Sequence, residues 1–202
     1  MARTQAADYE QRREAIVDAA ARLFAEKGFL GASISDIANA CEMSKSLIYH
    51  YYESKEDILF DVMHSHVKAL LDAAQTIAAQ SDKPEQKLRA LTRAFIQLYV
   101  GAASRQRVLL NELENLTADQ RKIVVGIQRN LIRIVEEIIA QVRPALSGRN
   151  PLGTPAAMLY FGMINWMHTW LDASGRAKPA RIADLTVNIF LDGVVNGDIP
   201  TQ

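Results

Sequence analysis

Apolar residues recur at helical spacing in nearly every segment of this chain, and that periodicity most constrains its fold. No stretch shows sustained strand-like alternation bounded by hairpin turns. One clear helical stripe is ended by Pro144, because proline cannot continue a helix. Its apolar residues are Ile123, Ile127, Leu131, Ile134 and Ile138. The pattern predicts an all-α fold.

Capping signals divide the chain into nine predicted helices. Asp8 with Gln11, Ser33 with Asp36, Ser54 with Asp57 and Thr117 with Gln120 have the spacing of capping boxes. Gly28 is a stop signal, and Thr154 followed by Pro155 is an N-cap and first-turn pair. The expected helices cover about 8–28, 33–41, a short helix from 44, 54–80, 84–100, 105–113, 117–143, 154–170 and 179–195.

Composition sets the broad class of the protein. Of 202 residues 49% are hydrophobic, which is enough for a packed core. No apolar run approaches the roughly 20 residues that span a bilayer, and the charged first thirty residues differ from a signal peptide. We therefore expect a cytoplasmic protein with no membrane partner. The single cysteine, Cys41, excludes an internal disulfide, and we expect it to be a small buried filler.

Charge gives no indication of a nucleic-acid partner. The formal net charge is zero, and residues 1–55 carry seven Lys and Arg against eight Asp and Glu. A DNA-binding interpretation must therefore depend on how particular side chains are arranged.

Residues 33–52 predict two short helices joined by a tight turn, as in a helix-turn-helix. The positions expected to face inward are Ile37, Ala38, Cys41, Met43, Ile48 and Tyr51. The positions left outside are Ser44, Lys45, Ser46, Leu47, Tyr49 and His50. Lys and His can meet guanine edges or phosphate, hydroxyls can bond bases or phosphate, and Leu can touch a thymine methyl. This outer face is predicted to read DNA.

The run ISDIANACEMSKSLIYHYYESKEDI, with Ser33 before it, resembles the N-terminal domain of TetR-type transcriptional repressors. The nine-helix layout is similar to that family over nearly the whole chain. The resemblance implies a DNA-binding domain at 1–53 and an effector-binding and dimerisation domain at 54–202. It further implies phosphate contacts by Ser33 and Ser44, base contacts by Lys45 and Ser46, DNA contacts by Tyr49 and His50, and a backbone contact by Lys55.

The turn before the reading helix departs from the family pattern. The family usually has Gly where this chain has Glu42. A positive φ at Glu42 would cost strain, and a carboxylate near phosphates would weaken affinity for DNA.

The last two predicted helices carry apolar stripes. Their members are Leu159, Met163, Trp166 and Trp170 on one helix and Ile182, Leu185, Ile189 and Phe190 on the other. The family resemblance implies that these helices form a four-helix bundle in a homodimer. The alternative is that they only close the core of the monomer.

The middle helices resemble the effector-binding part of the family. The candidate lining residues are Phe95, Tyr99, Leu110, Asn111, Leu113, Ile127 and Met163, with Arg107 and Arg133 as nearby cations. The segments RQRVLLNELENLTADQR and GMINWMHTWLDASGRAKPARIADLTVNIFLDG are similar to TetR-type repressors of fatty-acid and aromatic-acid breakdown. That similarity implies a repressor of a catabolic operon that responds to phenylacetyl-CoA or a fatty acyl-CoA.

Two alternatives for the effector remain open. Arg133 and Glu137 also make an ordinary i,i+4 pair, so the cations are equally explained by a solvated helix face. If the cations only form a solvated helix face, the effector is a free acid or a hydrophobic, drug-like molecule.

Other functional classes have little support. The chain has no nucleophile elbow, phosphate-binding glycine loop or HExxH motif. Asp61, His64 and His66 suggest a helical-bundle metal centre, but such a centre needs two Glu-x-x-His motifs, and the chain has four His in all. We therefore expect no enzyme activity, metal or cofactor. A helical scaffold without DNA recognition is supported only by Glu42.

Overall fold

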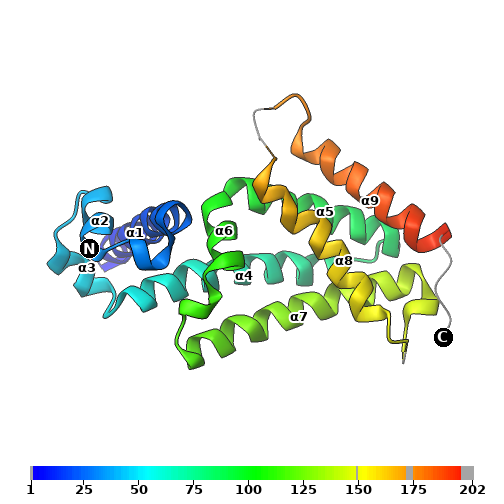
Figure 1. The fold of residues 1–202 in the computed structure, drawn as a ribbon, viewed down its shortest axis with the longest axis horizontal. Coiled ribbons are helices and arrows are strands. Elements are labelled where there is room, and N and C mark those ends of the chain that lie inside the picture. The colour runs from blue at the N-terminus through cyan, green and yellow to red at the C-terminus, as the bar shows by residue number, and fades with distance from the viewer. Residues whose placement is uncertain (1, 149, 172–174, 197–202) are drawn as a thin grey trace. The chain divides into compact units, whose positions relative to one another are not determined.

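The computed structural model describes residues 2–148, 150–171 and 175–196, and every regular element in these ranges is helical (Figure 1). The α-helices are α1 (Ala2–Gly31), α2 (Ile34–Ala40), α3 (Lys45–Tyr51), α4 (Lys55–Ala78), α5 (Pro84–Gly101), α6 (Ala103–Asn111), α7 (Ala118–Val142), α8 (Gly153–Asn165) and α9 (Pro179–Asn196). Short 3₁₀ turns cover Leu113–Asn115, Pro144–Leu146 and Trp166–Thr169. Over the described residues, the predicted all-α fold of nine helices is confirmed.

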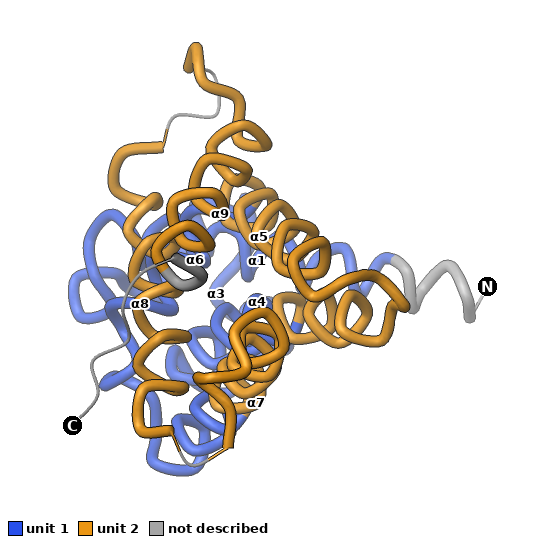
Figure 2. The backbone as a smooth tube through the Cα atoms, turned by 90° about the vertical axis from the view of Figure 1, so that its right-hand side faces the viewer, with its two compact units in different colours: residues 1–68, 102–126 blue, residues 69–101, 127–202 orange. Residues whose placement is uncertain are grey.

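The chain forms two compact units (Figure 2). Unit 1 takes in residues 1–68 and 102–126, so α6 and the start of α7 belong to the same unit as α1, α2 and α3, and α6 packs on α1. Unit 2 takes in residues 69–101 and 127–202. These units differ from the predicted domains 1–53 and 54–202, and that domain boundary stays a prediction.

Two predicted capping boxes are confirmed in full and a third in part. At α2 the Asp36 backbone N–H donates to Ser33 Oγ (3.1 Å), while the Ser33 backbone N–H donates to Asp36 Oδ2 (2.9 Å). The hydrogen bonds from Ser33 lower the pKa of Asp36 to about 2. Thr117 with Gln120 makes both corresponding bonds at the start of α7. At the start of α4 the Asp57 backbone N–H donates to Ser54 Oγ (3.1 Å), and the Ser54 hydroxyl donates to Asp57 Oδ2 (2.5 Å). Each pair satisfies N–H groups that a helix start leaves without partners.

The predicted start of the first helix is wrong, because α1 begins at Ala2. Asp8 accepts a hydrogen bond from Arg12 Nε (3.3 Å) one turn later and forms an ion pair inside the helix. The predicted stop at Gly28 is present as a break with φ 73° and ψ 162°, after which one further turn reaches Gly31. A left-handed φ of this kind is accessible to glycine without a steric penalty.

The predicted helix 154–170 is also corrected at both ends. It begins at Gly153, and Thr154 Oγ1 donates to Glu136 Oε1 (3.1 Å) where a cap was expected. It ends at Asn165, so Trp166 lies in the following 3₁₀ turn and Trp170 lies just beyond that turn. The His168 ring bonds the Asn165 carbonyl (2.6 Å), and such side-chain bonds compete with the α-helical ladder.

The core of unit 2 is built from α5, α7, α8 and α9 together with the part of α4 after residue 68. Tyr160 is fully buried, and its hydroxyl is 2.8 Å from the Thr92 hydroxyl, so its polar end has a partner. The Phe190 ring meets the Tyr160 ring edge-on at 5.5 Å and is only 7% exposed. Phe190, predicted at a dimer interface, therefore belongs to the core of the monomer.

None of the helices in the described part of the chain is long and apolar enough to cross a membrane.

Glu42, which stands where the family pattern has glycine, adopts the left-handed backbone conformation. Its φ is 55°, which makes it the one non-glycine residue with positive φ in the described ranges. It follows Cys41, the C-cap of α2, and its backbone N–H donates to the Asn39 carbonyl (3.1 Å). The chain thus closes the turn between α2 and α3 at a steric cost that glycine would avoid.

Replacing Glu42 by glycine should therefore stabilise the protein, by about 0.5–1 kcal/mol in the free energy of unfolding. Urea denaturation monitored by circular dichroism measures this difference. Glu42→Ala removes the same carboxylate but keeps the Cβ atom, so it serves as the control and should give no comparable gain. Equal gains in the two variants would show that charge, and not backbone strain, sets the effect.

Candidate DNA-binding and ligand-binding sites

Buried aliphatic residues hold α2 and α3 in place within unit 1. Ile37 and Ile48 are fully buried, and Ala38 is 2% exposed. Cys41 is half-buried, so the expectation of a buried filler holds only in part, and its Sγ lies 3.6 Å from the Ala15 carbonyl of α1. With these side chains turned inward, the opposite face of α3 is left to solvent.

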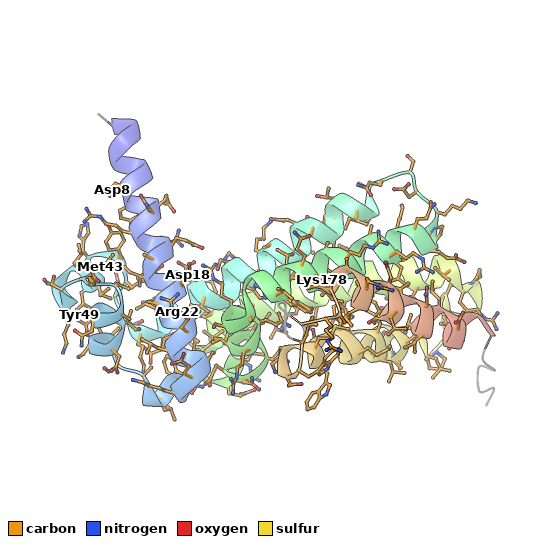
Figure 3. The ribbon with its side chains drawn as sticks, turned by 90° about the horizontal axis from the view of Figure 1, so that it is seen from above. Asp8, Asp18, Arg22, Met43, Tyr49 and Lys178 are labelled. Atoms are coloured by element: carbon orange, nitrogen blue, oxygen red, sulfur yellow. The ribbon has the colours of Figure 1, made fainter. Side chains whose placement is uncertain are left out.

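The predicted reading residues lie together on the first two turns of α3 and on its cap, and Figure 3 labels Tyr49 among them. Ser44 is the N-cap, and its Oγ accepts from the Leu47 backbone N–H (3.2 Å) and lies 2.9 Å from Ser46 Oγ. The exposed members of the predicted set are Ser44, Lys45, Ser46, Tyr49 and His50, with Tyr49 55% exposed. Leu47 is half-buried. This surface offers a cation, hydroxyls and an imidazole to one ligand.

Ser33 and Lys55, predicted to contact the DNA backbone, already have structural partners. The Ser33 hydroxyl is part of the capping box of α2. Lys55 Nζ donates to the carbonyls of Phe29 (2.8 Å) and Ala32 (2.9 Å) and lies 4.1 Å from the centre of the Phe29 ring. Two of the three ammonium donors thus hold the end of α1, and the predicted contact of Lys55 with DNA stays a prediction.

The sequence did not reveal an aromatic and ionic cluster that holds the reading helix on α1. The Tyr9 ring of α1 stacks on Tyr51 of α3 with centroids 4.7 Å apart. Asp61 of α4 accepts from the Tyr52 hydroxyl and pairs with Arg13 (2.8 Å). Burial and the bond to Asp61 raise the pKa of Tyr52 well above its usual value. Partners so far apart in the chain leave no signal in a local pattern.

The residues considered for a metal centre are engaged elsewhere. Asp61 belongs to the cluster above, and the ring of His64 stacks on Phe60 at 5.1 Å. His66 is 3% exposed, and its Nε2 lies 2.7 Å from Gln106 Oε1. Burial lowers the pKa of His66, which favours its neutral form.

The predicted ligand-binding residues divide between the two units. Arg107, Leu110, Asn111 and Leu113 lie in unit 1, whereas Phe95, Tyr99, Ile127, Arg133 and Met163 lie in unit 2. Arg107 and Asn111 line a cavity of about 270 Å³ between α1 and α6. Its other lining residues are Phe24, Ala25, Glu26, Gly28, Val108 and Glu112, which the sequence prediction missed.

The unit 2 members of that set are mainly core residues. Phe95 is fully buried and Tyr99 is 5% exposed, while Ile127 and Met163 pack against the same core from its edge. The Tyr99 hydroxyl lies 2.9 Å from Asn165 Oδ1, which places a polar pair inside an apolar cluster. Arg133 is exposed and pairs with Glu137 at 2.7 Å, which is the ordinary helix pair that the sequence allowed.

Most predicted dimer-interface residues are exposed apolar side chains. Leu159 is 70% exposed and Trp166 is 65% exposed. Trp170, Leu185 and Ile189 are also more than half exposed, whereas Met163 and Ile182 are half-buried. Helices α8 and α9 contact each other, and exposed large apolar side chains are candidates for a protein contact.

Comparison with known proteins identifies the family. Residues 16–62 match the family described as "Bacterial regulatory proteins, tetR family". Residues 81–194 match "Tetracyclin repressor-like, C-terminal domain". The first match contains α2, α3 and the start of α4, and the second contains most of unit 2.

Individual relatives agree with these matches. A TetR-family transcriptional regulator from Bordetella parapertussis 12822 has 38% sequence identity and a TM-score of 0.86, covering 94% of this chain and 98% of that one. AibR, solved with isovaleryl coenzyme A and operator DNA, has 29% identity and a TM-score of 0.77, covering 88% and 97%. The transcriptional repressor KstR2 of Rhodococcus jostii (strain RHA1) is 27% identical over 188 residues, 92% of each chain.

The capped reading helix, the all-α architecture and both family matches lead to one conclusion: this chain belongs to the TetR family of transcriptional regulators.

Proposed function

We propose that this protein is a repressor of a catabolic operon that binds operator DNA through α3 and leaves it when a CoA thioester binds. The observation that carries the DNA-binding part is the exposed face of α3, where Lys45, Ser46, Tyr49 and His50 follow the Ser44 cap. Recognition helices of helix-turn-helix proteins read bases from their N-terminal residues in this way. Such a regulator acts in the cytoplasm, where the operator DNA is.

The active form that we propose is a homodimer. A single helix-turn-helix reads a short site, and two copies about 34–36 Å apart read two half-sites one helical turn apart. The exposed side chains of Leu159, Trp166, Leu185 and Ile189 supply an apolar contact surface on unit 2. Burying them between two copies would remove apolar area from water and stabilise the pair.

The effector that we propose is an arylacetyl-CoA or a medium-chain acyl-CoA. Support comes from AibR, whose structure holds isovaleryl coenzyme A together with operator DNA. A CoA thioester joins an apolar acyl group to a multiply charged nucleotide, so its site needs apolar walls and cations. Arg107 supplies a guanidinium at the cavity between α1 and α6.

A free carboxylic acid is the second candidate effector. The Tyr99 and Asn165 side chains form a polar pair beside the buried Phe95 and Phe161 rings of unit 2. Apolar surroundings with one or two polar groups suit a small acid or a drug-like molecule.

Substitutions on α3 test the DNA-binding proposal. Lys45→Ala should weaken binding to the preferred duplex about tenfold and relax base preference, because a base-reading cation is lost. Tyr49→Phe should weaken binding to all duplexes by a similar factor if its hydroxyl bonds phosphate. Duplexes selected by the wild-type protein from a random library, titrated by fluorescence anisotropy at several salt concentrations, measure both effects.

Lys178→Ala is the matched control, since Lys178 is an exposed lysine of unit 2 (Figure 3). It should leave both affinity and base preference unchanged. Equal loss of base preference in the Lys45 and Tyr49 variants would contradict the separate roles assigned to them. Failure of the wild-type protein to select any duplex would sink the repressor proposal.

Thermal melting against a ligand panel tests the effector. A ligand that binds only the folded state raises the melting temperature, by about 5–10 °C at about 100 times its Kd. We expect this shift with phenylacetyl-CoA or octanoyl-CoA and not with CoA alone or the free acids. Arg107→Ala should reduce the shift for the thioester. A shift with phenylacetic or octanoic acid alone would instead support the second candidate.

A further inference from the structure

Arg105 makes an ionic junction between three helices of unit 1, with its own side chain largely buried and its two carboxylate partners, Glu14 and Asp18, more than half exposed. Its side chain is 13% exposed, although it carries a positive charge. The guanidinium of this α6 residue pairs through Nη2 with Glu14 and with Asp18 (2.8 Å), both on α1. Nη1 lies 3.4 Å from Ser65 Oγ on α4. No other cation of the described chain pairs with two carboxylates of α1.

The two carboxylates give this junction its strength. Glu14 and Asp18 are four residues apart, so they lie on one face of α1 and repel each other unless a cation stands between them. Burial by itself would lower the pKa of Arg105, but the hydrogen bonds to Asp18 and Glu14 raise it. The Arg105 guanidinium therefore stays charged. Separating α6 from α1 would leave this half-desolvated group without its two carboxylate partners.

The next residue extends the junction to α4. Gln106 is 1% exposed, and its Oε1 lies 2.7 Å from His66 Nε2. Two consecutive residues at the start of α6 are therefore joined by polar contacts to α1 and α4. Contacts of this kind have defined geometry, so they fix α6 more narrowly than apolar packing alone does.

The other end of the α1–α6 contact is open. There the cavity of about 270 Å³ separates Phe24 and Gly28 from Arg107 and Asn111. A Cβ atom at Gly28 would lie 3.6 Å from Glu112 Oε1, so α1 and the residue after α6 come close at the rim of the cavity. Helix α6 is thus held at Arg105 and has free volume beside it from Arg107 to Asn111, two to six residues later.

We propose that Arg105 is a positioning residue that couples ligand binding on α6 to the orientation of α3. Arg107 and Asn111 lie two and six residues after Arg105 on α6 and line the cavity, so a ligand there bears on α6. Helix α1 carries any displacement to the reading helix, because Tyr9 of α1 stacks on Tyr51 of α3. This inference rests on the proposed function, since it assigns the link between the effector and the DNA.

Thermodynamic linkage gives the inference a distinctive test. If the junction stabilises one of two arrangements of α6, breaking it shifts their populations. The affinities for DNA and for effector then change in opposite directions, because the two ligands prefer different arrangements. A residue with only a structural role would lower both affinities or leave both unchanged.

The variants are Arg105→Ala and Arg105→Lys. We expect Arg105→Ala to change the Kd for the selected duplex and the Kd for phenylacetyl-CoA about tenfold in opposite directions. Arg105→Lys should restore part of the wild-type behaviour, because an ammonium can pair with one carboxylate but lacks the planar fork. Arg121→Ala is the matched control, because it breaks an exposed pair with Glu114 (2.7 Å) in the same unit and should leave both constants unchanged.

Hydrogen exchange on the full chain gives a readout that needs no effector. Adding the selected duplex should change the exchange of α6 amides in the wild-type and Arg121→Ala proteins, and not in Arg105→Ala. Loss of that response supports the inference, and an unchanged response in Arg105→Ala overturns it. Failure of the wild-type protein to bind any duplex would overturn the proposed function itself. If the wild-type protein binds the duplex but Arg105→Ala does not change the two Kd values in opposite directions, only this inference is overturned.

Discussion

The width of the buried face of α1 determines how unit 1 is assembled. At 100° per residue, Ile16, Val17, Ala19, Ala20, Ala21 and Phe24 cover an arc of about 200° around the helix, and all are at most 2% exposed. A surface helix with one partner buries a narrower stripe. Helix α1 has a wide one because it packs on α2 and α6. The three alanines of this face let these partners approach the backbone of α1 closely.

This arrangement makes the reading surface dependent on contacts far from it. The face of α3 is exposed only because Ile48 is buried toward the rest of unit 1. The end of α1 is held by Lys55 from the first turn of α4, and its other end is held by the Tyr9–Tyr51 stack. Glu42 closes the turn at positive φ, so the surrounding packing compensates for local strain.

Local rules explain which parts of the fold could be predicted. The boxes at Ser33, Ser54 and Thr117 depend on residues three apart, so the sequence displays them directly. The inward positions of α2 and α3 follow from helical periodicity in the same way. The start of α1 was missed because Asp8 can either cap a helix or pair with Arg12 inside one, and the pattern does not distinguish the two.

Long-range contacts explain what could not be predicted. Phe190 has the spacing of an exposed stripe, and only its contact with Tyr160 on another helix places it in the core. The candidate ligand residues form one apolar set in the sequence, yet they divide between two compact units. Nothing in the local sequence distinguishes Arg105 from the other cations, because its partners Glu14 and Asp18 lie about ninety residues earlier.

Exposed and buried cations have different roles in unit 1. Lys45 lies exposed on α3, where it can meet phosphate or a base, whereas Arg105 is largely buried and satisfied by two carboxylates. An exposed cation contributes to binding through counterion release, and a buried one contributes geometry. Zero net charge is therefore compatible with DNA binding, because Glu14 and Asp18 of α1 are paired with Arg105. Recognition depends on the local arrangement of side chains on α3, which the burial of Ile48 and the Tyr9–Tyr51 stack hold in place.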